Sequence, residues 1–162
     1  MIRSALATVL FTLAAPCSVA IWIPRWILGR WPWLGDGPIQ LSLPLIGMGW
    51  ALYVWCATDF VRRGRGTPAP VAAPVRLVIR GAYRYTRNPM YVGMLLVLTG
   101  ESIQTRSVTL LGYAALVGML FHAFVLLYEE PALKRRFGTD YEKYRAAVPR
   151  WHFRLRRSRG GA

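Results

Sequence analysis

The chain has 162 residues and combines a formal net charge of +14 with a hydrophobic content of 54%. That apolar content excludes an intrinsically disordered chain, which has too few apolar residues to form a core. Its two cysteines, Cys17 and Cys56, both lie inside apolar runs, which excludes a disulfide-stabilised secreted scaffold and indicates small buried side chains. Long uncharged stretches alternate with arginine-rich ones, a pattern typical of a chain that is partly solvated by lipid.

Four apolar runs are candidates for membrane-spanning helices. Two of them, 4–23 and 39–58, have 20 residues each without a charge, and a helix of that length covers the roughly 30 Å of a bilayer core. The run 107–128 has 22 residues without Asp, Glu, Lys or Arg, and we expect it to end at the glutamate pair and proline that follow. The run 88–104 is shorter, contains one acid, and can cross only if its ends lie in the interface. The sequence therefore predicts an all-α membrane protein with four transmembrane helices, of which the third and fourth form a hairpin.

Basic residues are distributed unevenly over the ends of these spans. Arg3, seven arginines between Arg62 and Arg87, and ten Lys or Arg after Glu130 fall on one side, and three fall on the other. Because Lys and Arg near span ends remain cytoplasmic, we expect an integral membrane protein, in a bacterial inner membrane, with both termini in the cytoplasm. A signal peptide cleaved near Ala20 is the alternative for the start, but the apolar run continues past that point and favours a retained helix.

We interpret residues 1–162 as a single integral-membrane domain. Its parts are two N-terminal transmembrane helices (1–60), a cytoplasmic linker (61–87), a transmembrane hairpin (88–128) and a cytoplasmic C-terminal segment (129–162). Closely spaced glycines and prolines between Gly64 and Pro74 predict an extended loop in the linker. In the C-terminal segment, apolar residues recur at helical spacing from Leu133 to Tyr144. This spacing predicts an amphipathic helix whose basic face meets anionic lipid headgroups.

Polar residues near apolar spans are costly and mark candidate functional sites. Asn88 before Pro89 is a good helix start, because Asn accepts from free backbone N–H groups and proline loses nothing at the first helical position. Capping alone does not explain the tyrosines and arginines that surround this start between Tyr83 and Tyr91. An anion-binding or cofactor-binding helix N-terminus is therefore the alternative.

A second polar group is the adjacent pair Glu129 and Glu130 at the end of the fourth span. Adjacent carboxylates repel, and near lipid each needs a cationic or hydrogen-bonding partner. The pair is either an interfacial stop neutralised by arginines or part of a binding site. His122 lies seven residues before Glu129, about two helical turns earlier. It is either a packed, hydrogen-bonded side chain or part of the same site.

The stretch GAYRYTRNPMY (81–91), followed by a hairpin and by HAFVLLYEEPALKRRFGTDYEKYRAAVPRW (122–151), resembles the integral-membrane methyltransferases related to isoprenylcysteine carboxyl methyltransferase and the phospholipid N-methyltransferases. The resemblance covers roughly the second half of the chain. It implies a helical fold in which the two motifs together form an S-adenosylmethionine pocket at the cytoplasmic membrane surface. Asn88 stands where many relatives have histidine. Carried over to this sequence, the candidate cofactor-binding residues are Tyr83, Arg87, Asn88, Tyr91, His122, Glu129, Glu130, Tyr141 and Tyr144.

The implied function is S-adenosylmethionine-dependent methyl transfer to a lipophilic or small acceptor that presents a carboxylate, an amine or a thiol. The cofactor carries a sulfonium, an ammonium and a carboxylate, which suit acidic residues, aromatic faces and an arginine or helix N-terminus. Two alternatives stay open: a nicotinamide-dependent sterol-type or enoyl reductase, and a non-enzymatic membrane adaptor. Nucleic-acid binding is disfavoured because the arginines flank membrane spans, and no metal site is expected because the His and Cys residues are scattered.

Overall fold

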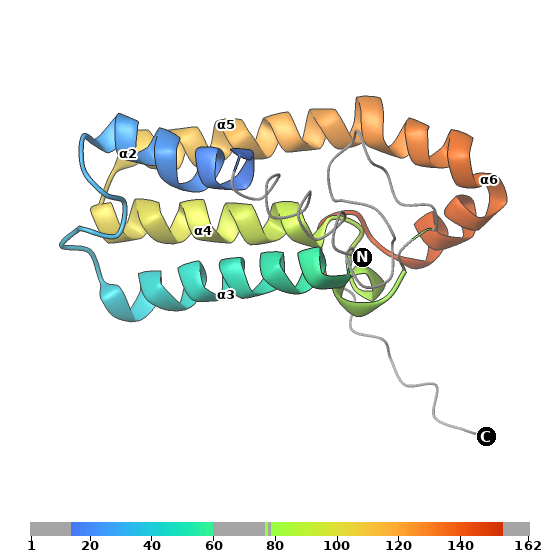
Figure 1. Ribbon diagram of the computed structural model, residues 1–162, viewed down its shortest axis with the longest axis horizontal. Helices are drawn as coiled ribbons and strands as arrows, with labels where there is room; N and C mark the ends of the chain where they lie inside the picture. Colours follow the sequence, from blue (N-terminus) through green and yellow to red (C-terminus); the bar gives the residue numbers. More distant parts are fainter. Residues whose placement is uncertain (1–13, 60–76, 78, 154–162) are drawn as a thin grey trace, which may run out of the picture.

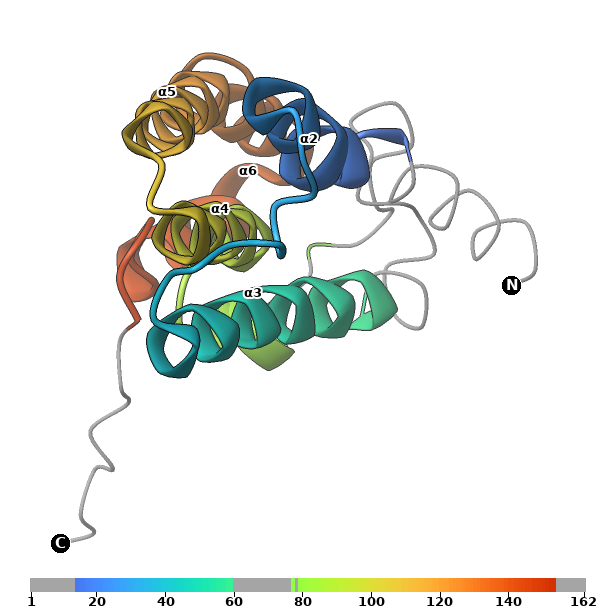
Figure 2. The ribbon, with the colours of Figure 1, turned by 90° about the vertical axis from the view of Figure 1, so that its left-hand side faces the viewer.

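The computed structural model describes residues 14–59, 77 and 79–153, which form helices and no strands. Three helices, α3 (Ile39–Asp59), α4 (Pro89–Thr105) and α5 (Val108–Phe124), lie side by side with α4 in the middle (Figure 1). The short helices η1 (Ser18–Trp22) and α2 (Ile23–Leu28) pack beside α4 and α5 (Figure 2). Three predicted parts lie outside the described residues: the first span before residue 14, the linker over 60–76, and the C-terminal segment after residue 153.

Small residues allow α3 and α4 to approach each other closely. A Cβ atom added at Gly49 would lie 2.5 Å from the carbonyl oxygen of Gly93, and one added at Gly93 would lie 2.7 Å from the carbonyl oxygen of Gly49. Two turns further along α4, Gly100 lies against Ile46 and the backbone of Ser42. Glycine at these points permits the backbone-to-backbone contact by which helices associate in lipid. This contact fixes α3 against the central helix.

The outward faces of α3 and α5 carry large apolar side chains that are at least half exposed. Examples are Leu41, Met48 and Val54 on α3 and Leu111 and Met119 on α5. Such a surface is unfavourable in water and typical of contact with lipid. Two described helices are long and apolar enough to cross a membrane, Ile39–Asp59 and the continuous helix Val108–Ala147. The other two spans stay predictions.

Helices α4 and α5 occupy the predicted hairpin 88–128 and are joined by a tight turn. Arg106 ends α4 in the left-handed conformation, with a φ of 50°. Ser107 then begins α5 as a capping residue, because its hydroxyl accepts the backbone N–H of Leu110 at 3.1 Å. The turn reverses the chain, so the start of α4 and the end of α5 lie at the same end of the bundle (Figure 1).

The fourth apolar helix does not end at the glutamate pair, so that prediction is wrong. After Phe124, a π-helical turn, η5 (Val125–Glu129), leads directly into α6 (Glu130–Ala147). Pro131 is tolerated because it lies in the first turn of α6, directly after the π-turn has shifted the hydrogen-bond register.

Helix α6 is broken at Gly138, a feature that the apolar periodicity does not reveal. Gly138 has φ and ψ of 50° and −123°, a conformation that side-chain-bearing residues rarely adopt. The chain turns back there toward the start of α4 (Figure 1), and Tyr141, Tyr144 and Val148 become buried together. The break therefore returns the C-terminal part of the described chain to the end of the bundle.

The close α3–α4 contact predicts that Gly49→Ala lowers the free energy of unfolding by about 1–3 kcal/mol, because its Cβ would collide with the Gly93 backbone. Gly47→Ala is the matched control on the same helix, since no atom lies within 4 Å of its added Cβ. We expect the control to be neutral or slightly stabilising, as alanine favours helix. Thermal unfolding in detergent measures both variants, and equal effects would contradict the contact.

Candidate functional site

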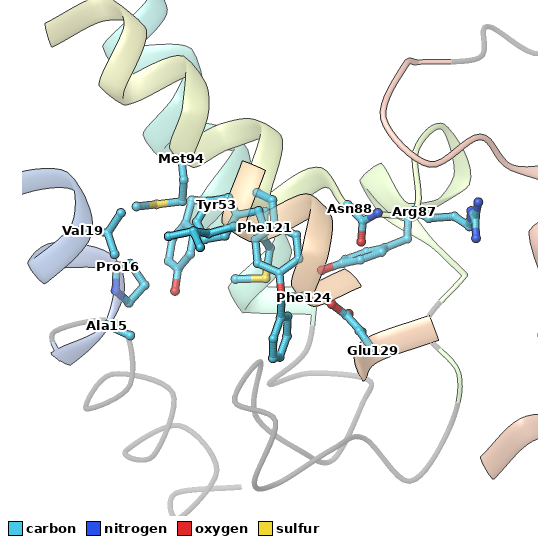
Figure 3. Close-up of a pocket in the computed structure, with 14 residues that line it drawn as sticks. Ala15, Pro16, Val19, Tyr53, Arg87, Asn88, Met94, Phe121, Phe124 and Glu129 are labelled. Atoms are coloured by element: carbon cyan, nitrogen blue, oxygen red, sulfur yellow. Dashed lines mark hydrogen bonds between the residues drawn. The ribbon is translucent and has the colours of Figure 1, made fainter. Parts of the chain in front are cut away.

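A cavity of about 590 Å³ lies between η1, α3, α4 and α5, at the end of the bundle where α4 begins (Figure 3). Its volume is within the range of ligand pockets, roughly 300–1,000 Å³. The apolar wall includes Val19, Tyr53, Met94, Phe121 and Phe124, and the polar end is formed by Tyr83, Arg87, Asn88, Tyr91 and Glu129. Figure 3 shows Arg87, Asn88 and Glu129 to one side of the apolar group. The cavity therefore presents two different surfaces to a ligand.

Glu129 is the acid at the polar end. Its Oε2 accepts the hydroxyl of Tyr91 at 3.0 Å, and the Tyr91 ring packs on Phe121 with 4.6 Å between centroids. Burial raises the pKa of the Glu129 carboxyl; the hydrogen bond from Tyr91 opposes this rise, and the charge of Glu130 adds to it. Among the described residues, the ion pairs do not include Glu129. The cavity therefore contains a carboxylate that a cationic ligand would stabilise.

Glu130 is held between two arginines. Its Oε1 lies 2.9 Å from Nη1 of Arg87 and 2.6 Å from Nε of Arg150, and its Oε2 lies 3.1 Å from Nη2 of Arg150. Burial would raise the pKa of the Glu130 carboxyl, but the hydrogen bond from Arg150 and the charges of Arg87, Arg150 and Arg145 outweigh it and lower the pKa. Glu130 is thus neutralised, in contrast to its neighbour.

Asn88 occupies the N-cap position of α4, but its side chain does not cap the helix. Its φ and ψ of −126° and 51° lie outside the β region usual for a capping residue, and its Nδ2 instead donates to the carbonyl of Arg150 at 3.1 Å. The hydroxyl of Thr86 donates to the same carbonyl at 3.0 Å, and the backbone N–H of Arg87 donates to the carbonyl of Pro149 at 2.9 Å. The predicted side-chain cap is wrong, because Asn88 fastens the segment after α6 to the start of α4.

The other four predicted residues do not line the cavity. The hydroxyl of Tyr141 accepts Nη1 of Arg87 at 3.4 Å, and the hydroxyl of Tyr144 donates to the carbonyl of Tyr83 at 2.8 Å. His122 is exposed on α5, and its Nδ1 accepts the indole N–H of Trp151 at 3.0 Å. Five of the nine predicted residues, Tyr83, Arg87, Asn88, Tyr91 and Glu129, thus meet at one cavity, and Glu130 lies directly beside them.

Arg150 and the apolar wall are absent from the site residues predicted from sequence. The wall comes from separate helices, with Pro16 just before η1, Val19 in η1, Tyr53 on α3 and Phe121 on α5. In the sequence, each of these residues looks like an ordinary core or lipid-facing residue of an apolar helix. No local signal therefore marks it as part of a binding site. For Arg150, the only available signal was that adjacent acids near lipid need cationic partners.

Apolar helices with lipid-facing side chains, and a cavity that joins an apolar wall to a buried carboxylate, define a helical membrane protein with a site for a ligand that is partly apolar and partly charged. Within the described part of the chain, His, Cys, Asp and Glu form no group that could hold a metal ion. The phospholipid methyltransferase family (PEMT) matches residues 39–140, more than half of the chain. The protein belongs to this family of membrane methyltransferases, which generally use S-adenosylmethionine.

The chain is also similar to the cobalt-zinc-cadmium resistance protein CzcN of Cupriavidus metallidurans, with 29% identity over 133 residues. The aligned part is 81% of this chain and 57% of that relative, so the chain spans little more than half of the relative's length. No solved structure matches the chain.

The contact between Asn88 and Arg150 predicts that Asn88→Asp lowers the free energy of unfolding by about 1–3 kcal/mol, because a carboxylate cannot donate to a carbonyl. A purely capping Asn88 would tolerate this change, since Asp caps a helix as well as Asn does. Ser107→Asp is the matched control, because Ser107 does cap α5, and we expect no loss there. Thermal unfolding without ligand compares the two; a neutral Asn88→Asp would argue against the contact.

Proposed function

We propose that this protein transfers a methyl group from S-adenosylmethionine to a lipophilic acceptor at the cytoplasmic surface of a membrane. The observation that carries the proposal is a cavity that joins an apolar wall between membrane helices to a polar end containing Glu129. An enzyme that brings a charged cofactor to a lipid-soluble substrate needs both surfaces in one place. Membership in the phospholipid methyltransferase family supports the same chemistry.

The residues at the polar end fit the charges of S-adenosylmethionine. Glu129 suits the α-ammonium, and the aromatic faces of Tyr91 and Phe121 suit a sulfonium cation. The side chain of Arg87 is 10% exposed, and among the described residues its Nε has no hydrogen-bond partner, so it is a donor available to the cofactor carboxylate. Asn88 and Tyr83 complete the proposed contacts, while Glu130, Tyr141 and Tyr144 support them from outside the cavity. His122 does not line the cavity, and we leave it outside this set.

The bound cofactor supplies a methyl group on a positively charged sulfur, so the protein needs no nucleophile of its own. The polar end holds and orients the cofactor, and the apolar wall aligns the acceptor so that its nucleophile lies in line with the methyl group. Met94, Phe121 and Phe124 line the cavity and exclude water from the space between the cofactor and the acceptor. The apolar wall favours an acceptor with a hydrocarbon part, whose reacting group is a carboxylate, an amine or a thiol.

We infer that the end of the bundle with the cavity faces the cytoplasm. Exposed basic residues gather there, on η4 (Gly81–Arg84) and along α6. Arg25, Arg30 and Arg106 lie at the opposite end, near the α2–α3 connection and the α4–α5 turn. The larger number of cations belongs on the cytoplasmic side. There the exposed Lys134 and Arg135 of α6 would meet anionic headgroups.

The proposed cofactor contact predicts that the purified protein binds S-adenosylmethionine and its demethylated product, and that Glu129→Gln weakens this binding about ten- to a hundredfold through loss of a charge-assisted contact. Glu142→Gln is the control, because Glu142 pairs with Lys134 on the surface of α6. Titration calorimetry measures both variants.

Cofactor binding in this experiment, together with a methyl-transfer assay, separates the alternatives. Binding of a nicotinamide cofactor in place of S-adenosylmethionine would indicate the reductase. Binding of neither would indicate the adaptor. Transfer of labelled methyl groups to a lipid extract would support the enzyme and identify its acceptor.

The proposed orientation predicts that reporters inserted near Pro70 and fused after Ala162 are cytoplasmic, and that a reporter inserted near Asp36 is on the other side. Paired phosphatase and fluorescent-protein fusions measure this. Finding Pro70 and Ala162 on opposite sides would exclude the four-span arrangement.

A further inference from the structure

Glu129 and Glu130 are adjacent in sequence but have opposite surroundings. Glu129 lines the cavity, accepts the Tyr91 hydroxyl, and takes no part in the ion pairs among the described residues. Glu130 does not line the cavity and contacts two guanidinium groups. The two acids therefore have different electrostatic surroundings, and the guanidinium groups around Glu130 are part of that difference.

Arg150 makes most of the contacts to Glu130. Its guanidinium reaches both carboxylate oxygens, at 2.6 and 3.1 Å, whereas Arg87 reaches one oxygen at 2.9 Å. A planar pair with two parallel contacts fixes the orientation of a carboxylate as well as neutralising it. Because Arg87 and Arg150 share Oε1 of Glu130, Arg150 also determines where the carboxylate meets Arg87.

The segment that carries Arg150 is fastened at several points. The carbonyl of Arg150 accepts side-chain hydrogen bonds from Thr86 and Asn88, and the next residue, Trp151, donates its indole N–H to His122 on α5. These contacts connect the segment to the start of α4 and to α5. Because these contacts anchor the backbone at Arg150, they also fix the position from which its guanidinium reaches Glu130.

We propose that Arg150 is a positioning residue for cofactor binding: it holds Glu130 as the neutralised partner of Arg87, so that Glu129 alone presents a carboxylate to the cavity. The inference rests on the proposed function, because it assigns Glu129 to the cofactor ammonium. It extends the site beyond the residues that the family matches, which end at 140.

The charged groups around Glu130 define what the loss of Arg150 does. The groups that interact with Glu130 from the segments packed around it are Arg87, Glu129, Tyr141, Arg145 and Arg150. Burial already raises the pKa of Glu129, and the charge of Glu130 raises it further. Without Arg150, less of the Glu130 charge is cancelled, so the pKa of Glu129 rises again. Protonated Glu129 does not attract an ammonium, so cofactor affinity is lost at a higher pH than in the wild type.

The test is the pH dependence of S-adenosylhomocysteine binding, measured by calorimetry from acid to neutral pH, because the acid limb of the binding curve reports protonation of a carboxyl whose pKa is raised. R150Q is expected to move the midpoint of the acid limb upward by about one pH unit, which is about tenfold weaker binding on that limb. R150K keeps the charge but replaces the planar two-point contact with a single ammonium, so its midpoint should lie between those of R150Q and the wild type. In E130Q/R150Q both charges are absent, so the midpoint should return to the wild-type value or below it.

Two controls separate positioning from folding. R135Q removes the same charge from an exposed position on α6 and should leave the midpoint unchanged. Thermal unfolding without ligand shows whether each variant is folded, and R150M, which keeps the aliphatic stem, replaces R150Q if that variant fails to fold.

A purely structural role of Arg150 would weaken binding equally at every pH, and E130Q/R150Q would not recover it. A folded R150Q or R150M protein with the wild-type midpoint would overturn the inference, as would failure of E130Q/R150Q to restore the midpoint. If the wild-type protein binds neither S-adenosylmethionine nor S-adenosylhomocysteine, the proposed function itself fails. If the wild-type protein binds the cofactor and R150Q shows the same pH dependence, the inference about Arg150 is wrong but the proposed function stands.

Discussion

A carboxylate at the end of an apolar helix needs a cationic or hydrogen-bonding partner, and this constraint organises the end of the bundle that holds the cavity. Glu130 meets it through Arg87, just before α4, and Arg150, just after α6. The three segments are thereby held together, and the hydrogen bonds from Asn88 and the Arg87 backbone reinforce them. The reversal at Gly138 makes this possible, because it returns the chain to Glu130 over only 20 residues.

The central helix has two faces with different tasks. On one face, Gly93 permits direct backbone contact with α3, which leaves no room for a ligand. On the cavity side, Tyr91 packs on Phe121 of α5, and both residues line the cavity together with Met94. Tight packing on one side of α4 and a cavity on the other therefore come from residues one or two positions apart. This arrangement holds the polar end of the cavity on a rigid helix.

The family match and the site do not cover the same residues. The match runs from 39 to 140, whereas the cavity also uses Val19, and the ion cluster also uses Arg150. The matched range includes Tyr83, Arg87, Tyr91 and the two acids, but not Tyr141 or Tyr144. The neutralisation of Glu130 depends on a segment outside the match, so the electrostatics of this site belong to the whole described chain and not to the family motifs alone.

Local signals predicted the helix boundaries well where proline and a polar residue mark a start. The expected third span, 88–104, differs from α4 by one residue at each end. The continuation of the helix through Pro131 and the break at Gly138 were not predictable, because a π-turn and a left-handed glycine depend on what the helix packs against. The capping role expected for Asn88 failed for a similar reason: the competing acceptor, the carbonyl of Arg150, lies 62 residues away in the sequence.

By itself the sequence determined that the chain is helical and apolar, with arginines between its apolar runs, and that acids and tyrosines lie near the ends of two adjacent helices. These properties follow from composition and spacing. Only the tertiary structure decided that Glu129 faces a cavity while Glu130 lies between two arginines. Neighbouring residues on a helix point in different directions, and the two cations that neutralise Glu130 come from separate segments. The α4–α5 hairpin brings Arg87 to it, and the chain reversal at Gly138 brings Arg150.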